Sequence, residues 1–468
     1  MGTKEEGLGD LLQDVRRIHM IGIGGSGMNA LAKVLAEAGY QVSGSDLSLS
    51  KTTETLASIG IEIKQGHAAD NVAGADLVVI SSAIPADNPE LSKARSLGLQ
   101  VVKRAELLSE LTRRQRSILV AGTHGKTTTS SMTALLLERA GLDPTIIVGG
   151  DVIDLGTSAK LGKGDYLVAE ADEFDRTFLK LSPWTAVITN VEADHLDYYG
   201  SLDAIVEAFD KFIGMVPEDG HLVACWDEPP LRKLARRRGR GVVSYGIKSQ
   251  ADWRAVRIKP NALGGNDFEV RRRGERVGRF SLQVPGRHNV LNALASIAAA
   301  SLVGVDLDEA RETLAGFRGA ARRFELKGAA NGIVVYDDYA HHPTEIAATL
   351  KGARERHPGR IWAVFQPHTY NRTKHHLLGF ARALELADQV VVTDIYMPAG
   401  REVDTLGISA SDIVRAMNHA AARHIPRLDE VVAHVVARLQ PGDMLLTMGA
   451  GDVNKVAVAV LKRLGEKG

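Results

Sequence analysis

Short apolar runs alternate with helix-period stretches along most of this chain. The first apolar run, residues 18–21, leads through a glycine-rich turn into a helical stretch that begins near Met28. The alternation starts again at Ser117 and once more near Ile333. Apolar strands separated by helices are typical of parallel sheets covered by helices. The pattern therefore predicts an α/β fold built from three successive units.

Length and charge narrow the class of protein. A chain of 468 residues favours about three domains, and we place them at residues 1–111, 112–324 and 325–468. The chain has 57 basic residues (Lys plus Arg) and 57 acidic ones (Asp plus Glu), so its formal net charge is zero. A protein without net positive charge gives no indication of nucleic acid or an anionic membrane as a partner. The sequence leaves open whether the protein is a monomer or a homodimer.

Cysteine usage and the N-terminal residues bear on the compartment. Cys225 is the only cysteine, so an intrachain disulfide is impossible and a reducing cytoplasm is favoured. Glu5, Glu6 and Asp10 stand where a signal peptide needs an apolar core. No apolar run approaches the roughly 18 residues that span a bilayer. We therefore expect a soluble, cytoplasmic protein.

A phosphate-binding loop follows the first strand of the second block. The apolar run 118–121 leads into Gly122-Thr123-His124-Gly125-Lys126-Thr127-Thr128, where a helix-forming stretch begins. In such a loop backbone N–H groups cradle a polyphosphate, the lysine neutralises its terminal oxygens, and the threonine hydroxyl reaches Mg²⁺. The strict pattern has a glycine where this chain has Val120, so the loop is a shortened variant, and a purely structural turn is the alternative. We predict that these seven residues bind ATP.

Carboxylates gather after two further strands of the second block. Glu170 ends one strand directly, and the acidic segment 192–197, which contains His195, follows the next. Carboxyl ends of parallel strands share one edge of a sheet, where the phosphate loop also lies. Oxygen ligands suit Mg²⁺, and the imidazole of His195 suits Mn²⁺ at least as well. We predict a metal site at Thr127, Glu170 and His195; solvated surface is the alternative for the neighbouring acidic residues.

The glycine run of the first block matches G-x-G-x-x-G between a strand and a helix. Asp46 stands 19 residues beyond its last glycine, Gly27. Alone, this pattern suggests a dinucleotide site. Beside a separate ATP loop, a nucleotide-linked substrate held by its diphosphate is the better interpretation. The residues expected to hold it are Gly24, Gly25, Ser26, Gly27, Asp46 and Ser82. Helix capping is the alternative for Asp46 and Ser82.

Two asparagines stand near the start of a helix predicted over residues 289–302. Asn289 and Asn292 lie on one face of its first turn, where amides can contact a base or a ribose. Capping accounts for Asn289 almost as well.

The third block opens with a second polar cluster. Asp338, His341 and His342 follow its first strand, at the edge where doubly wound sheets bind ligands. Arg322 and Arg323 precede that strand, and closure of the third domain would bring a guanidinium onto the phosphates; a surface salt bridge is the alternative.

Taken together, these motifs resemble those of the ATP-dependent Mur ligases, which build the peptide stem of bacterial peptidoglycan. The resemblance covers nearly the whole chain, and seven motifs in register are more specific than any one. They lie at residues 22–28, 121–128, 170–173, 190–195, 287–289, 322–324 and 337–343. The resemblance implies an N-terminal Rossmann-like UDP-binding domain, a central P-loop-type ATPase α/β domain and a C-terminal Rossmann-like α/β domain for the amino acid.

Within the family, the motifs are most similar to those of members that join L-alanine to the lactyl carboxylate of UDP-N-acetylmuramate. The implied reaction uses ATP and a metal ion and passes through an acyl phosphate. The catalytic or nucleotide-binding residues that the resemblance implies are Lys126, Glu170, His195, Asn289, Asn292, Arg323 and Asp338. We add His342 as the base for the amino acid, because imidazole titrates near the working pH.

Three rival interpretations remain open. A recycling ligase would join a whole tripeptide to the same UDP-sugar. A nicotinamide-dependent dehydrogenase would use the first glycine run but leave Lys126 without a role. An ATP-binding regulatory protein without turnover would not need the carboxylates at the strand ends.

Overall fold

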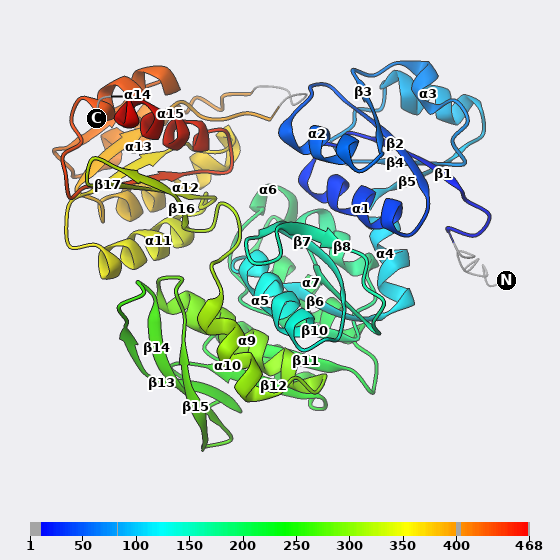
Figure 1. The fold of residues 1–468 in the computed structure, drawn as a ribbon, viewed down its shortest axis with the longest axis horizontal. Coiled ribbons are helices and arrows are strands. Elements are labelled where there is room, and N and C mark those ends of the chain that lie inside the picture. Colours follow the sequence, from blue (N-terminus) through cyan, green and yellow to red (C-terminus); the bar gives the residue numbers. More distant parts are fainter. Residues whose placement is uncertain (1–10, 82, 399–403, 467–468) are drawn as a thin grey trace.

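The computed structural model describes residues 11–81, 83–398 and 404–466, which form three sheets covered by helices (Figure 1). Each sheet is the centre of one unit, and the units follow one another along the chain. The expected three-part α/β fold is confirmed.

The first sheet is parallel and has the strand order β3-β2-β1-β4-β5. Its strands are β1 (Arg17–Ile21), β2 (Gln41–Asp46), β3 (Glu62–Gln65), β4 (Leu77–Ile80) and β5 (Gln100–Lys103). Its helices are α1 (Ser26–Glu37), α2 (Lys51–Ser58), the 3-10 turn η1 (Ala69–Val72), α3 (Pro89–Ser96) and α4 (Arg104–Arg114). The order reverses between β1 and β4, which is where a Rossmann-like sheet binds its ligand.

The central sheet has ten strands in the order β15-β14-β13-β12-β11-β10-β6-β9-β7-β8. They are β6 (Arg116–Ala121), β7 (Thr145–Val152), β8 (Thr157–Lys160), β9 (Tyr166–Glu170), β10 (Thr185–Ile188), β11 (His221–Cys225), β12 (Val242–Gly246), β13 (Trp253–Pro260), β14 (Asn266–Arg272) and β15 (Glu275–Ser281). The middle of the sheet is parallel, as the sequence predicts, but β7 with β8 and β13 to β15 add antiparallel ends that the sequence analysis did not predict.

Helices α5 and α9 lie side by side and are buried along most of their length. Helices without a polar face are typical of protein interiors. Ser296 Oγ on α9 donates a hydrogen bond to the Thr129 carbonyl on α5 at 3.0 Å. The phosphate loop leads into α5, and Asn289 and Asn292 stand near the start of α9. The contact between the two helices therefore holds the loop beside these asparagines. The helices of this unit are α5 (Lys126–Arg139), the 3-10 segment η2 (Phe174–Lys180), α6 (Leu196–Tyr199), α7 (Leu202–Gly214), α8 (Pro229–Arg238), α9 (Arg287–Leu302) and α10 (Leu307–Gly316).

The third sheet has the order β16-β17-β21-β18-β19-β20, parallel except for the edge strand β16. Its strands are β16 (Glu325–Ala330), β17 (Ile333–Asp338), β18 (Ile361–Phe365), β19 (Gln389–Val392), β20 (Ala422–His424) and β21 (Met444–Met448). Its helices are α11 (Pro343–Arg356), α12 (Tyr370–Leu384), α13 (Ala410–Ala416), α14 (Leu428–Val436) and α15 (Asn454–Gly465). Strands β18 and β21 are buried throughout, as expected when helices cover both faces.

The first and central units share one buried apolar core, and the third unit has its own. One cluster of buried side chains continues from α1 and the first sheet into the central sheet and α9. The third sheet has separate clusters on its two faces. In Figure 1 the third unit, in yellow, orange and red, lies apart from the first, in blue, with the central unit below both.

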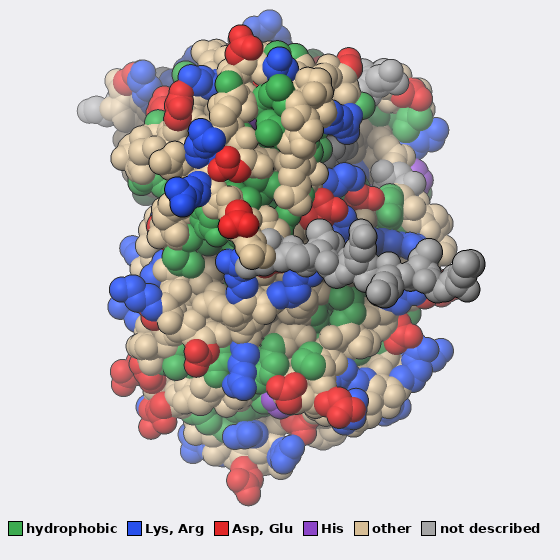
Figure 2. All heavy atoms as spheres, turned by 90° about the vertical axis from the view of Figure 1, so that its right-hand side faces the viewer, with side chains coloured by type: hydrophobic (Ala, Val, Ile, Leu, Met, Phe, Trp, Pro, Cys, Tyr) green, Lys and Arg blue, Asp and Glu red, His purple; other side chains and the backbone are tan. Residues whose placement is uncertain are grey.

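The surface in Figure 2 carries Lys and Arg side chains interspersed with Asp and Glu. Neither sign dominates that face, which agrees with the equal totals of acidic and basic residues. Substrates that carry charge must therefore be recognised by local groups in a cavity rather than by a long-range field.

The proposed domain limits fall close to changes of element. Residue 112 lies in the last turn of α4, which leads into the central sheet, and residue 325 is the first of β16. The division of the chain at these positions stays a proposal. Among the helices formed by the described residues, none is long and apolar enough to cross a membrane.

Candidate active site

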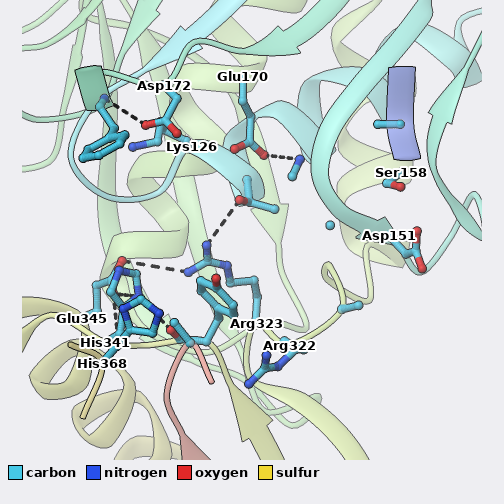
Figure 3. Close-up of a pocket in the computed structure, with 18 of the residues that line it drawn as sticks. Lys126, Asp151, Ser158, Glu170, Asp172, Arg322, Arg323, His341, Glu345 and His368 are labelled. Carbon is cyan, nitrogen blue, oxygen red and sulfur yellow. Dashed lines mark hydrogen bonds and ion pairs between the residues drawn. The ribbon is translucent and has the colours of Figure 1, made fainter. Parts of the chain in front are cut away.

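A cavity of about 910 Å³ opens where the three units meet. The central wall contains the phosphate loop, the end of β9 and the segment that follows β10, and the other walls come from α1 and α2, the linker at 321–323 and the third unit. Figure 3 shows Lys126, Glu170 and Asp172 facing Arg323, Glu345, His341 and His368 across it. The structure thus brings most of the predicted central and C-terminal residues to one place.

The phosphate loop is shaped by the residues that follow β10. At Gly122 the backbone φ is 136°, and a Cβ there would stand 2.0 Å from Thr189 Oγ1, so only glycine fits. Thr189 Oγ1 donates to the His124 carbonyl at 2.6 Å, and the His124 N–H donates to Asn190 Oδ1 at 2.8 Å. Side chains of the neighbouring strand end therefore fix the course of the loop.

Lys126 lies inside the loop and is paired with a buried carboxylate. Its Nζ donates to the Gly122 carbonyl at 2.6 Å and to Glu173 Oε2 at 2.7 Å. Burial opposes the charge on Lys126, but the carboxylates of Glu173, Asp172 and Glu170 outweigh it and raise its pKa. Burial raises the pKa of Glu173 to about 7, although Lys126 acts in the opposite direction. Lys126 therefore keeps its positive charge at neutral pH.

The three predicted metal ligands, Thr127, Glu170 and His195, all line this cavity. The Gly149 N–H donates to Glu170 Oε1 at 2.6 Å and so orients the carboxylate. Burial lowers the pKa of His195, which favours the neutral imidazole that a metal ligand requires. A hydroxyl, a carboxylate and a neutral imidazole form a donor set that fits a divalent cation.

A second cavity, of about 230 Å³, adjoins the first at Gly125, Arg323 and Glu345. Asn289 and Asn292 line it, and the Nδ2 of Asn292 donates to Asn289 Oδ1 at 3.1 Å. A Cβ at Gly125 would come 2.7 Å from Asn292 Oδ1, so the asparagine face lies directly against the phosphate loop. The predicted nucleotide residues in its wall are His124, Gly125, Thr128, Asn289, Asn292, Arg323 and Asp338.

The two linker arginines lie over one ring but make different hydrogen bonds. The guanidinium carbons of Arg322 and Arg323 are 5.0 Å and 5.2 Å from the ring centre of Tyr339. Arg322 donates to Asp337 Oδ2 at 3.0 Å and to two carbonyls of the third unit. Arg323 donates to Thr127 Oγ1 at 3.3 Å. Arg323 is therefore the arginine that reaches the phosphate loop.

Asp338 is a buried carboxyl at the end of β17. Its Oδ1 accepts from the Ala340 N–H at 2.7 Å, and its Oδ2 accepts from the Phe324 N–H at 2.9 Å. Burial raises its pKa to about 6, and Arg323 opposes that rise. Asp338 thus holds the linker to the third sheet and lines the smaller cavity.

His342 is placed less favourably for catalysis than the sequence suggested. It caps α11, and its Nδ1 accepts from the Thr344 N–H at 3.3 Å, so the neutral ring carries its hydrogen on Nε2. Within the walls that the described residues form, His342 belongs to neither cavity. His124, Glu192 and His342 bring ligand atoms within 4.8 Å of one another. A protonated Nε2 is no metal ligand, however, so this cluster is a poor metal site.

His341 carries its ring hydrogen on the other nitrogen. Its Nδ1 lies 3.0 Å from the Tyr339 carbonyl, which can only accept, so its hydrogen is on Nδ1 and its lone pair is on Nε2. Burial lowers the pKa of His341 to about 4, and the ring is neutral at pH 7. His341 lines the larger cavity.

In the first unit Asp46 supports the glycine turn. The Gly24 N–H donates to Asp46 Oδ2 at 3.0 Å, and a Cβ at Gly24 would come 2.8 Å from the same oxygen. A Cβ at Gly27 would come 2.6 Å from Arg104 Nη1. A side chain at Gly24 would therefore displace Asp46, and one at Gly27 would push the flexible Arg104 side chain aside.

The predicted UDP-sugar residues lie away from the two cavities. Among the described residues, Gly24, Gly25, Gly27 and Asp46 form no part of either cavity wall. The first unit contributes Asn29 and Ala30 of α1, among others, to the larger cavity. Ser82 and the side chain of Ser26 lie outside the described residues.

Several cavity residues were not predicted from the sequence. They are Lys33, Lys51, Glu345, His368 and Arg372. Glu345 carries a local signal, because it stands three residues after the helix cap His342, as the glutamate of a capping box does. The other four have no local sequence pattern, and only the assembled fold brings them to the cavity.

Three sequence profiles of one family match successive parts of the chain. They are described as "Mur ligase family, catalytic domain" at residues 17–116, "Mur ligase middle domain" at 120–300 and "Mur ligase, glutamate ligase domain" at 322–451. An α/β protein of three units with a cavity where they meet is the class that the fold and the site define, and the matches follow the same three units. The chain belongs to the Mur ligase family.

Individual relatives narrow the comparison. The chain is 48% identical, over 96% of its length and 98% of the relative, to a UDP-N-acetylmuramate–L-alanine ligase of Pelotomaculum thermopropionicum. A solved UDP-N-acetylmuramate-alanine ligase from Thermotoga maritima is 32% identical with a TM-score of 0.83, and the match covers 97% of this chain and 100% of that one. A murein peptide ligase from Psychrobacter arcticus is 28% identical with a TM-score of 0.72, covering 96% and 99%.

Replacing Gly125 by alanine tests the contact between the phosphate loop and α9. Gly125 has φ of 81°, and the new Cβ would meet Asn292 Oδ1 at 2.7 Å. The left-handed backbone costs about 1–2 kcal/mol for alanine, and the clash displaces the asparagine. We expect Gly125→Ala to weaken ADP binding by at least about tenfold, measured by calorimetry.

Gly141→Ala is the matched control at the other end of α5. Gly141 has φ of 69°, and no atom lies within 4 Å of the place that a Cβ would take, so alanine there carries the backbone cost without the clash. Equal ADP affinity in the two variants would show that the loop does not depend on its contact with Asn292.

Proposed function

We propose that this chain is an ATP-dependent, ADP-forming ligase that joins L-alanine to the lactyl carboxylate of UDP-N-acetylmuramate. The observation that carries the proposal is the convergence, in one cavity, of a phosphate loop, strand-end carboxylates and walls from all three units. The alanine-ligase names of the relatives, at up to 48% identity over nearly the whole chain, support the choice of substrates. The reaction serves the synthesis of peptidoglycan precursors.

The first step makes an acyl phosphate. A lactyl carboxylate oxygen attacks the γ-phosphorus of ATP, a new P–O bond forms, and the bond to ADP breaks. Lys126 and Arg323, which both line the cavity, offset the charge on the transferred group. We propose Mg²⁺, or Mn²⁺, as the cofactor held by Thr127, Glu170 and His195; when bound, it neutralises phosphate charge.

The second step forms the amide bond. The amine of alanine attacks the activated carbonyl, the new C–N bond forms, and the C–O bond to phosphate breaks. The alanine ammonium must first lose a proton. His341 is better placed for this task than His342, because it lines the larger cavity and has a free Nε2 lone pair, whereas Nε2 of His342 carries a hydrogen. To act as the base it requires a bound substrate that raises its pKa from about 4 toward the working pH.

The nucleotide is expected to lie across both cavities. Its phosphates would lie along Gly125 and Arg323, which line both, and its nucleoside would fill the smaller cavity beside Asn289 and Asp338. The third unit then supplies the amino-acid wall, with His368 and Arg372. A guanidinium in that wall suits the carboxylate of a free amino acid.

The rival functions are less well supported. The murein peptide ligase is a more distant match than the alanine ligase among the solved structures, by both identity and TM-score. A dehydrogenase leaves Lys126 and Glu170 without a task. The single cysteine favours the cytoplasm as the compartment, and the protein acts as a monomer or a homodimer in this proposal.

Phosphate release in the presence of ATP tests the function directly. We expect release only when UDP-N-acetylmuramate and L-alanine are both present, because the acyl phosphate needs the sugar and its turnover needs the amine. Release that needs the tripeptide L-alanyl-γ-D-glutamyl-meso-diaminopimelate instead of L-alanine would establish the recycling ligase. Release independent of both sugar and amino acid would reject ligation.

Lys126→Ala tests the role of the loop lysine. Removing this charge is expected to lower kcat by at least about a hundredfold, the scale seen when one donor to a developing charge is lost. Binding of UDP-N-acetylmuramate, measured by calorimetry, should stay within about twofold. Lys180→Ala removes an exposed ion pair with Glu106 and serves as the control. Near-normal kcat in Lys126→Ala would exclude the assigned role.

The two neighbouring histidines can be separated by glutamine variants. We expect His341→Gln to lower kcat by about a hundredfold, because general-base catalysis is typically worth that much, and to leave acyl-phosphate formation intact. His342→Gln should have the smaller effect on kcat. Amide formation and acyl-phosphate formation are measured separately, with and without L-alanine. If kcat falls strongly in His342→Gln and not in His341→Gln, the base is His342.

A further inference from the structure

Four of the side-chain contacts between the central unit and the linker or third unit lie beside the phosphate loop, and we call these four the polar seam. They are Thr127 with Arg323, His124 with Glu345, Glu192 with Thr344, and Asp194 with Arg372, at 2.9 to 3.4 Å. On the central side all four residues follow β6 or β10, at the carboxyl edge of the sheet. The seam therefore lies beside the phosphate loop.

Glu345 is the member of the seam that touches both sides at once. Its Oε2 accepts from the N–H groups of His341 at 3.0 Å and His342 at 3.3 Å, which closes the capping box of α11. Its Oε1 lies 3.1 Å from His124 Nδ1 and 4.0 Å from Arg323 Nη1. One carboxylate thus connects the start of a third-unit helix to the phosphate loop and to the linker arginine.

The position of Glu345 is also central to the site. It lines both cavities, together with Gly125 and Arg323, and Figure 3 shows it beside His341 with its contact to Arg323. His124 is part of the loop itself, between Thr123 and Gly125. Any shift of Glu345 therefore displaces a loop residue and an arginine that reaches Thr127.

The charges support a strong contact. Burial alone would neutralise Glu345, but the neighbouring histidines and Arg323 outweigh it and hold its pKa well below the usual range. Since His341 is neutral at pH 7, the cations that face Glu345 there are His124 and Arg323. For His124, burial is outweighed by Glu192 and Glu345, which raise its pKa to about 9. A carboxylate facing an imidazolium forms a charge-assisted hydrogen bond, which is roughly twice as strong as a neutral one.

We propose that Glu345 is a positioning residue for phosphoryl transfer, which holds His124 and Arg323 in place so that docking of the third unit completes the phosphate site. The proposal rests on the ligase function above. It assigns Glu345 no contact with the reacting atoms. The phosphate site is then fully formed only when the domain that supplies the amino-acid wall is docked.

Glu345→Gln is the informative variant, because glutamine still fits a capping box but carries no charge. Losing a hydrogen bond to a charged group is expected to lower kcat/KM for ATP by about tenfold to a hundredfold. His124→Gln should cause a similar loss. Because both variants break the same contact, the double variant should be at most about twofold worse than either single one. UDP-N-acetylmuramate binding and the melting temperature should stay unchanged.

Glu106→Gln is the matched control. Glu106 is also the glutamate of a capping box, on α4, and it pairs with Lys180 outside the cavity. This variant should keep kcat/KM for ATP within about twofold. A merely structural role for Glu345 would instead lower the melting temperature and weaken UDP-sugar binding as much as ATP use.

The outcomes separate the two proposals. Additive losses in the double variant, or unchanged kcat/KM for ATP in Glu345→Gln, would overturn the positioning role while leaving ligation intact. Wild-type protein without sugar-dependent phosphate release would instead reject the ligase function. If Glu345→Gln does not fold, Glu345→Asp provides the second test. It keeps the charge but shortens the reach, so it should also lose ATP use without losing UDP-sugar binding, and normal ATP use would contradict the proposal.

Discussion

The burial of β6 between β9 and β10 is the constraint on which the site depends. The three strands are parallel and in register, with Val120 beside Glu170 and Ala121 beside Ile188. Because register fixes where each strand ends, the phosphate loop, Glu170 and the segment that follows Ile188 emerge at one level of the sheet. A slip of one residue would send buried apolar side chains to the opposite face. Apolar pairing thus determines where the charged groups meet.

The cavity groups carry their charges in pairs. Lys126 faces Glu173, and Arg372 faces Asp194 at 3.3 Å. Pairing is expected because an isolated charge in a partly buried site is costly. Pairing also means that a bound triphosphate must compete with the protein carboxylates for the cationic side chains that these carboxylates hold. Those carboxylates then lose their partners, and the unbalanced negative charge agrees with the divalent cation that we propose at Thr127, Glu170 and His195.

Sequence reasoning predicted features that local chemistry encodes. The parallel strands around β6, the phosphate loop and the shared face of Asn289 and Asn292 all follow from short patterns. The contact between His124 and Glu345 joins residues 221 positions apart, and no local pattern encodes it. The hydrogen position on His342 depends on the cap it makes in the folded helix. Long-range contacts and protonation states were therefore the part that needed the structure.

The two kinds of domain contact have different consequences for motion. Separating the first and central units would expose an apolar core, at about 25 cal/mol for each Å². The polar seam can exchange its hydrogen bonds for water at a net cost of about 0.5–3 kcal/mol each, with the higher values for contacts between charged groups. Chain contacts to the central unit extend to Ala321, and the Arg322 carbonyl already binds the third unit. The linker backbone therefore passes from the central unit to the third unit between these two residues. Arg323 follows that change, and its guanidinium still donates to Thr127 of the central unit at 3.3 Å, so the polar seam begins directly at the linker.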